Sequence, residues 1–258
     1  MENIQQKRNH LFIILSGIFI TNAMLAEMIG VKIFSAEGTL GLQPAQLNIM
    51  GFVMDFNLTA GVVIWPVVFI TTDLINEYFG KPGVKRISYF TAALIAYAFV
   101  VVFIAIRLSP ADFWMNGKDP DGNVFNMDVA FNKIFGQGQR IIIGSLTAFL
   151  IGQLVDVFVF QQLRKYTGSK MLWLRSTGST LVSQFVDSFV VLYIAFAGVF
   201  TNDQIIAIGI TNYIYKFVVA VVLTPVIYIG HGLIDKYLGK EAAHQISEEA
   251  SHSSKGFF

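Results

Sequence analysis

The sequence predicts an all-α integral membrane protein with six transmembrane helices. Of its 258 residues, 54% are hydrophobic and 14% are charged, and the mean hydropathy is +0.60. A soluble domain carries about 25% charged residues, so too few charges remain here to cover a water-facing surface. A spanning helix needs about 20 mostly apolar residues. The chain offers six such stretches, at 11–34, 59–79, 87–108, 141–162, 177–200 and 204–230.

Individual residues within these stretches refine the prediction. The first stretch is too long for a cleaved signal peptide, whose apolar region has about 7–15 residues. Pro66 and Pro225 lie inside the second and sixth stretches, where each predicts a packing kink because proline frees a backbone carbonyl. The six helices form a single transmembrane domain over residues 1–239. The polar segment 240–258 is expected to be a disordered cytoplasmic tail.

The basic residues predict how the helices are oriented. Segments on the side of the N-terminus hold 12 of the 18 Lys and Arg residues, the opposite loops hold four, and Lys32 and Lys216 lie in the spans. Because cytoplasmic loops are enriched in Lys and Arg, both termini are predicted to be cytoplasmic. In the outer loop between the third and fourth helices, residues 126–135 carry apolar side chains at helical spacing, which predicts a short interfacial helix.

Composition excludes several kinds of site. The chain has no cysteine, which removes disulfides, thiolate zinc sites and cysteine nucleophiles. None of its four histidines lies inside a long apolar stretch, so no cofactor and no metal are expected. The net charge is +1 and no basic stripe is present, so nucleic acid is not an expected partner. The expected partners are the lipid bilayer and a small molecule.

Six ionisable residues lie inside the predicted helices. An ionisable side chain in a spanning helix costs several kcal/mol unless it faces a cavity or a partner, so each is a functional hypothesis. The six are Glu27, Lys32, Asp73, Asp156, Asp187 and Lys216. Glu77, by contrast, lies near the cytoplasmic edge of its helix, where solvation by water is the simpler expectation.

A repeated motif connects the fourth and fifth helices. Gln153 and Asp156 belong to a Q-x-x-D-x-F-V pattern that recurs thirty-one positions later at Gln184 and Asp187. A spacing of three residues puts Gln and Asp on one helix face, and a short loop makes the two helices an antiparallel hairpin whose polar faces meet. The candidate substrate-binding residues are Asp73, Gln153, Asp156, Gln184, Asp187, Asn212 and Lys216, with Asn22, Glu27, Thr72, Phe69 and Ser183 as secondary candidates.

Two interpretations of these polar residues remain open. They could join helices, with Asp187 and Lys216 as a buried ion pair. Alternatively they line a chamber near the middle of the membrane, which we favour because a stable six-helix bundle needs no such concentration of costly groups. Carboxylates, carboxamides and aromatic rings suit a flat heterocycle, since one carboxylate accepts two adjacent N–H groups of a guanine-like edge. A phosphate-binding glycine-rich loop is absent, which argues against nucleotides.

Three motifs resemble one bacterial family. They are the segment 69–81 (FITTDLINEYFGK), the segment 152–164 (GQLVDVFVFQQLR) and Trp173-Leu-Arg175 followed by Ser179, Thr180 and Asp187. Together they resemble the queuosine precursor transporters, formerly labelled vitamin uptake transporters. The resemblance implies a multi-pass protein of the bacterial inner membrane. It also implies import of 7-cyano-7-deazaguanine or 7-aminomethyl-7-deazaguanine, precursors used in tRNA modification, and implies that the chain is not an enzyme.

Two other function classes compete with a self-sufficient transporter. One is a substrate-capture subunit of an ATP-driven importer of the energy-coupling-factor type, for which Ala26-x-x-x-Gly30 would provide a face for a partner helix. The other is an intramembrane enzyme, which is disfavoured because no His or Cys is available in the spans as base or nucleophile. The sequence leaves the oligomeric state open, a homo-oligomer included.

Overall fold

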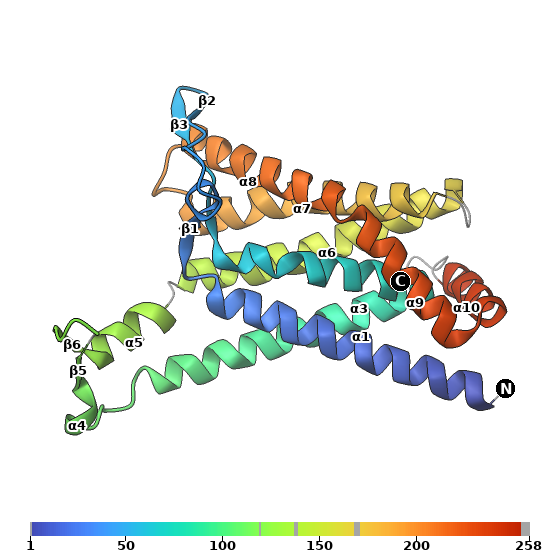
Figure 1. Cartoon of the computed structure of the whole chain (residues 1–258), viewed down its shortest axis with the longest axis horizontal. Coiled ribbons are helices and arrows are strands. Elements are labelled where there is room, and N and C mark those ends of the chain that lie inside the picture. The colour runs from blue at the N-terminus through green and yellow to red at the C-terminus, as the bar shows by residue number, and fades with distance from the viewer. Residues whose placement is uncertain (1, 119, 137–138, 168–170, 254–258) are drawn as a thin grey trace.

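The chain folds into an elongated helical bundle. The computed structural model describes residues 2–118, 120–136, 139–167 and 171–253. Five helices within those ranges are long and apolar enough to cross a membrane, so the protein is an all-α, multi-pass membrane protein. They are α1 (Glu2–Ile29), α3 (Trp65–Ala105), α6 (Gln139–Thr167), α7 (Leu172–Phe196) and α8 (Asn202–Val222). The long helices lie side by side along one axis (Figure 1).

Helix α3 contains two of the predicted spans. Its 41 residues would reach about 60 Å at 1.5 Å per residue, twice the thickness of a hydrocarbon core. The backbone breaks at Gly80, where φ is 65° and ψ is −171°. Glycine adopts a positive φ without a Cβ clash, and the chain reverses direction there (Figure 1). The first arm ends at this turn and the second returns beside α1.

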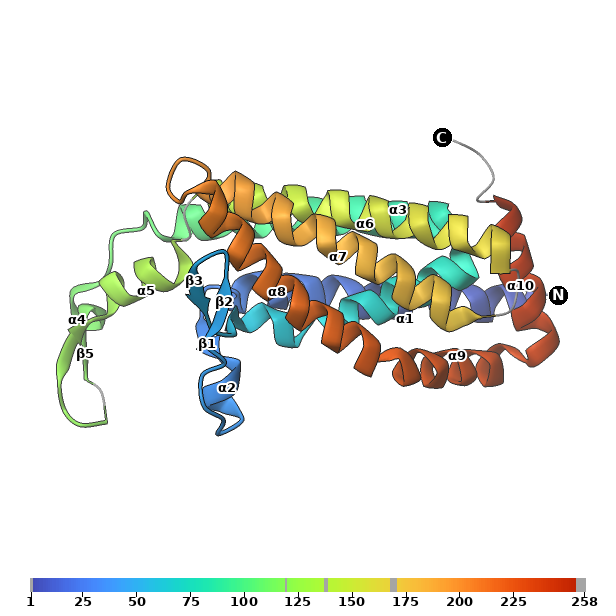
Figure 2. The ribbon, with the colours of Figure 1, turned by 90° about the horizontal axis from the view of Figure 1, so that it is seen from above.

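The two prolines mark helix starts rather than mid-helix kinks. Pro66 lies in the first turn of α3, after the 3₁₀ helix η1 (Ala60–Val63), where its missing N–H costs nothing. Pro225 lies in the first turn of α9 (Thr224–Leu238), which begins after Leu223 ends α8. Figure 2 shows α9 continuing the run of α8 with a change of direction. The predicted sixth span is therefore two helices.

Short strands and helices lie at one end of the bundle. The strands were not predicted, since the sequence predicted helices alone. Strand β1 (Ile33–Ser35) pairs with β4 (Asn57–Thr59), β2 (Leu47–Ile49) with β3 (Phe52–Met54), and β5 (Asn116–Lys118) with β6 (Val124–Asn126), all antiparallel. The first helix accordingly ends at Ile29 rather than residue 34. Two short helices, α2 (Ala36–Thr39) and α4 (Asp112–Met115), lie in the same loops. This end is called the strand end below.

Helix α5 (Met127–Phe135) occupies the residues predicted to form a short helix in the outer loop. The side chain of Asn126 caps its first turn by accepting from the N–H groups of Asp128 and Val129. It projects beyond the bundle at the strand end (Figure 1). Whether α5 rests on a bilayer stays a prediction.

The C-terminal segment is ordered, contrary to the expectation of a disordered tail. Residues 240–253 form helix α10 (Lys240–Ser253), and 254–258 lie outside the described residues. The apolar face of α10 buries Ala243, Ile246 and Ala250, and the helix packs on α3 and α9. Burying one isoleucine stabilises by about 1.5–3 kcal/mol, which holds an otherwise polar helix in place. Helix α10 and the start of α1 lie opposite the strand end (Figure 2) and define the termini end.

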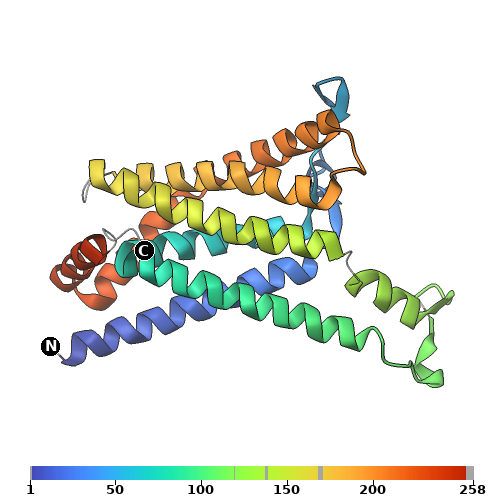
Figure 3. The ribbon, with the colours of Figure 1, turned by 180° about the vertical axis from the view of Figure 1, so that it is seen from behind.

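Most of the polar residues of the predicted spans lie on α3, α6, α7 and α8. Helices α6 and α7 form the most extensive pair, and they run antiparallel along the bundle (Figure 3). The apolar core is built mainly by α1, α3 and α6, with contributions from α9 and α10. This core holds α3 against α6. The Gln and Asp face of α6 is thereby turned toward both α3 and α7.

Candidate functional site

A polar cavity lies between α3, α6, α7 and α8. About 360 Å³ of space, part of it open to solvent, lies between the side chains that line it. Seven of the predicted site residues line it: Phe69, Gln153, Asp156, Ser183, Gln184, Asp187 and Lys216. The structure thus brings the two Q-x-x-D faces together around one space, as their helical spacing requires.

Two acceptor atoms at this cavity have no partner. Asp156 is 5% exposed, and its Oδ1 accepts a hydrogen bond from the Ser183 hydroxyl at 3.2 Å. Its Oδ2 and the Oε1 of buried Gln184 make no hydrogen bond to any residue that the structure describes. A buried acceptor left unpaired costs about 1–3 kcal/mol. The Ser179 hydroxyl also acts on the Asp156 carboxylate. Asp156 and Gln184 both line the cavity, so a ligand that donates to them would offset this cost.

An ion pair closes one wall of the polar cavity. Lys216 on α8 donates to Asp187 Oδ2 on α7 at 2.6 Å, and both side chains are largely shielded from water. This is the ion pair that the sequence analysis predicted for the case in which the polar residues join helices. It also lies at the cavity surface, so the same two residues are available to a ligand.

A second, mostly apolar cavity adjoins the first. About 500 Å³ of space, part of it open to solvent, lies between the first arm of α3 and helices α7, α8 and α9. Trp65, Phe69 and Lys216 line both cavities. Asp73 contributes the one carboxylate among the described residues that line this second space. The Ser176 hydroxyl donates to Asp73 Oδ2, while Asp73 Oδ1 has no partner among the described residues.

The other predicted residues lie outside both cavities. Thr72 is buried, and its hydroxyl contacts the Val68 carbonyl at 2.8 Å and Gln153 Oε1 at 3.3 Å, so it positions Gln153. Asn212 is half-buried on α8, one turn before Lys216. On α1, Asn22 donates to a carbonyl of its own helix, and both oxygens of Glu27 lie 2.6 Å from the Ser145 hydroxyl.

Several residues of the cavity walls were not among the predicted site residues. Trp65 stacks on Phe69 with ring centroids 5.8 Å apart, and Phe149 packs against Trp65 at 5.9 Å. Trp65 precedes Phe69 by four residues and Phe149 precedes Gln153 by four, so helical spacing from known candidates would have found both. Thr180 and Tyr215 line the apolar cavity. Thr180 belongs to the third motif of the family resemblance, whereas no sequence signal distinguishes Tyr215.

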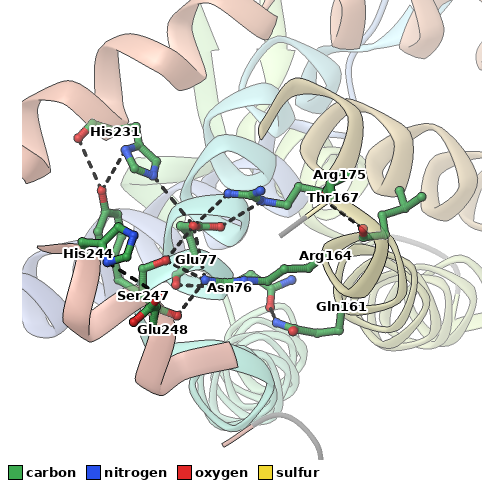
Figure 4. A network of polar contacts seen from close by, with 12 residues as sticks. Asn76, Glu77, Gln161, Arg164, Thr167, Arg175, His231, His244, Ser247 and Glu248 are labelled. Carbon is green, nitrogen blue, oxygen red and sulfur yellow. Dashed lines mark hydrogen bonds and ion pairs between the residues drawn. The ribbon is translucent and has the colours of Figure 1, made fainter. Parts of the chain in front are cut away.

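A buried ion cluster around Glu77 lies toward the termini end, one helical turn beyond Asp73 (Figure 4). Arg175 of α7 donates two hydrogen bonds to Glu77, from Nε to Oε2 at 3.1 Å and from Nη2 to Oε1 at 2.9 Å. Arg164 of α6 lies 3.4 Å from the same carboxylate, and Ser247 of α10 donates to it at 2.8 Å. His231 of α9 lies 4.0 Å away. One carboxylate thus joins five helical elements.

Two predictions about the Glu77 cluster were wrong. Glu77 was expected to be solvated by water, and Arg164 and Arg175 were expected to lie in a loop between two spans. Glu77 is 3% exposed, and the two arginines are buried beside it. Helix α10 contributes to this burial, because Arg164 Nη2 also donates to the carbonyl and hydroxyl oxygens of Ser247, both at 2.6 Å. The bidentate geometry of Arg175 suits a carboxylate that has left water.

The protonation of His231 predicts a pH dependence of stability. Burial lowers the pKa of His231, but the carboxylates of Glu77 and Asp235 outweigh it and raise the pKa above 6.5. A raised pKa stabilises the fold below the unfolded-state pKa, and that contribution is lost as the pH rises through the folded-state value. The thermal midpoint of purified His231→Gln is therefore expected to fall below wild type by more at pH 5.5 than at pH 8.5.

The matched control for this prediction is His244→Gln, since His244 is exposed on α10 and pairs loosely with Glu248 at 3.8 Å. His244→Gln should leave the midpoint unchanged at both pH values. An equal midpoint difference for His231→Gln at pH 5.5 and 8.5 would show that its charge does not contribute.

Comparisons with known proteins point to one family. The family model described as "Putative vitamin uptake transporter" matches residues 59–230, which include both cavities. A protein named "Probable queuosine precursor transporter" from Bacillus subtilis is 31% identical over 74% of this chain and 80% of its own length. The "Queuosine precursor transporter" of Escherichia coli is 29% identical over 66% of this chain and 71% of its own. A "Probable queuosine precursor transporter" from Haemophilus influenzae is 27% identical, covering 69% and 71%. No solved structure matches.

Proposed function

The chain belongs to the queuosine precursor transporter family, and from this premise we propose that it imports 7-cyano-7-deazaguanine, 7-aminomethyl-7-deazaguanine or both through the polar cavity. The observation that carries the proposal is the pair of unpartnered acceptors, Asp156 Oδ2 and Gln184 Oε1, at a cavity within the matched region. Such a site favours a ligand that presents several N–H donors along one edge.

The walls of the polar cavity support a flat ligand. Asp156 Oδ2 would accept from the adjacent ring and amino N–H groups of a 7-deazaguanine, a charge-assisted interaction about twice as strong as a neutral one. The stacked Trp65 and Phe69 offer an aromatic face to the ring. Lys216 would donate to the ring carbonyl, and its pairing with Asp187 keeps the empty site from holding an isolated charge.

We further propose six crossings with both termini in the cytoplasm of the bacterial inner membrane. The break at Gly80 divides α3 into two arms, and α1, α6, α7 and α8 supply the other crossings. The start of α1 and helix α10 lie at the same end of the bundle (Figure 1), as an even number of crossings requires. The Lys and Arg asymmetry of the loops assigns that end to the cytoplasm.

The competing class is a capture subunit that needs an ATPase partner. Its sequence argument was a face at Ala26 and Gly30 open to another helix. In the structure Ala26 is 2% exposed, and a Cβ on Gly61 of η1 would lie 2.5 Å from the Ala26 carbonyl oxygen. This chain's own η1 therefore packs against Ala26, which favours a transporter that works alone.

Reconstitution distinguishes the two classes. Purified protein in liposomes is expected to take up labelled precursor in a saturable manner without ATP, and liposomes carrying Asp156→Asn should show background uptake. Saturable binding by the wild-type protein with no accumulation in liposomes would instead support an obligate partner. Absence of both binding and uptake in folded protein would contradict the proposed substrates.

A further inference from the structure

The carboxylate of Asp73 is buried at the apolar cavity with an unused acceptor. The residue is 2% exposed, and Asp73 Oδ1 has no partner in the part of the chain that the structure describes. Its other oxygen accepts from Ser176. An apolar wall surrounds it, with Ile70, Val219 and Leu223 among the lining residues. A carboxylate in such surroundings is costly unless a partner reaches it.

The basic residues nearest to Asp73 form ion pairs with other carboxylates. Arg175 acts on Asp73 through its charge, yet its guanidinium makes a bidentate contact with Glu77. Lys216 lines the same cavity as Asp73 but donates to Asp187 at 2.6 Å. Burial of Asp73, and then the negative charges of Asp156 and Glu77, disfavour a negative charge on Asp73.

The ionisable residues that line the two cavities are mostly acidic. Asp73, Asp156 and Asp187 are acidic, and Lys216 is the one basic residue among the described residues that line either space. A buried carboxylate without a partner tends to take up a proton. Because electrostatic attraction is strong away from water, a ligand that brings a positive charge would stabilise the ionised form of these carboxylates, whereas a neutral heterocycle would not.

The shared wall places Asp73 at a space next to the one proposed for the ring. Trp65, Phe69 and Lys216 border both cavities, so a ring that binds at Asp156 and Gln184 lies beside the space that Asp73 lines. Of the two precursors, the aminomethyl form carries a primary amine, which like lysine is protonated at neutral pH. The cyano form is uncharged.

We propose that Asp73 binds the ammonium of the 7-aminomethyl group, and that this contact makes the protein select the cationic precursor over the neutral one. The inference rests on the proposed function and assigns its specificity to one residue. A hydrogen bond to a charged group is worth about 1.5–3 kcal/mol, which corresponds to a preference of about 10-fold or more.

Equilibrium binding of three ligands to the purified full-length protein tests this assignment. The ligands are 7-aminomethyl-, 7-cyano- and 7-hydroxymethyl-7-deazaguanine, the last being a neutral group of nearly the same size as aminomethyl. Wild-type protein is expected to bind the aminomethyl compound at least about 10-fold more tightly than the hydroxymethyl compound. Asp73→Asn should reduce that ratio to within about threefold and retain the affinity for the cyano compound. The control Asp203→Asn, at an exposed position that begins α8, should keep the wild-type ratio.

Each alternative outcome is distinguishable. Equal affinity of wild-type protein for the aminomethyl and hydroxymethyl compounds overturns the inference without any variant, and leaves the proposed function standing. A wild-type ratio in Asp73→Asn overturns it as well. A third outcome would show that Asp73 binds a proton rather than the ligand. In that case the affinity of wild type for the neutral ligands would depend on pH, the affinity of Asp73→Asn would not, and wild type would not prefer the charged ligand, which overturns the inference. Failure of all three ligands to bind folded protein contradicts the proposed function itself.

Discussion

Replacing Asp156 with asparagine is expected to reduce cellular uptake of labelled queuosine precursor to background. Asp156 is 5% exposed and lines the polar cavity, and its Oδ2 accepts no hydrogen bond within the described part of the chain. An amide has nearly the same shape but places an NH₂ group where the substrate also has donors. Loss of a charge-assisted bond with this mismatch corresponds to about 3 kcal/mol, or roughly a 100-fold loss of affinity.

The measurement compares initial uptake rates at equal amounts of protein in the membrane. Asp203→Asn removes a carboxylate from an exposed position and should transport at the wild-type rate. Asp187→Asn is expected to impair uptake too, because it leaves Lys216 without its partner. Near-normal uptake by both Asp156→Asn and Asp187→Asn would remove the polar cavity as the substrate site.

Replacing Glu77 with glutamine is expected to destabilise the protein more than any surface substitution. The change removes the carboxylate that both buried guanidinium groups, those of Arg164 and Arg175, contact. Breaking a buried ion pair from one side costs about 3–5 kcal/mol. A loss of that size lowers the thermal midpoint by about 10 °C in a protein of this length.

The control for this prediction is Glu249→Gln, which breaks an exposed pair with Arg8 at 3.2 Å. Exposed pairs contribute at most about 1 kcal/mol, so the midpoint should hardly move. Thermal unfolding of both variants in the same detergent provides the comparison. Equal midpoints for Glu77→Gln and Glu249→Gln would show that the Glu77 cluster does not hold the termini end together.

The sequence predicted the helices and the polar cavity for the same physical reason. Lipid and core both demand apolar residues, so long apolar stretches marked the spanning segments. Polar residues inside those stretches were few enough to recognise individually. The three-residue spacing of Gln153 and Asp156, repeated at Gln184 and Asp187, then placed all four side chains on facing surfaces. These features depend on local periodicity, which a sequence displays directly.

The Glu77 cluster depended on a packing that the sequence concealed. Arg164 and Arg175 flank a short loop and were counted as loop residues. In the structure Ser247 of α10 contacts Arg164, and Arg175 is held by Glu77. Helix α10 was assigned to a disordered tail because it is polar on average. Its signal was the spacing of Ala243, Ile246 and Ala250, which puts small and apolar side chains on one face.

The short strands of the outer loops were equally difficult to anticipate. Each strand has three residues, and their pairing depends on turns such as the one between Ile49 and Phe52, where Met50 and Gly51 both adopt positive φ. Three-residue strands carry too little alternation to be distinguished from loop.

Direct binding of labelled 7-aminomethyl-7-deazaguanine to the purified protein tests the central claim, that the polar cavity is a substrate site for queuosine precursors. We expect one saturable site in wild-type protein and in Asp203→Asn, with affinity about 100-fold lower in Asp156→Asn. Saturable binding of equal affinity in wild type, Asp156→Asn and Asp187→Asn would contradict the claim, as would an absence of binding to folded wild-type protein.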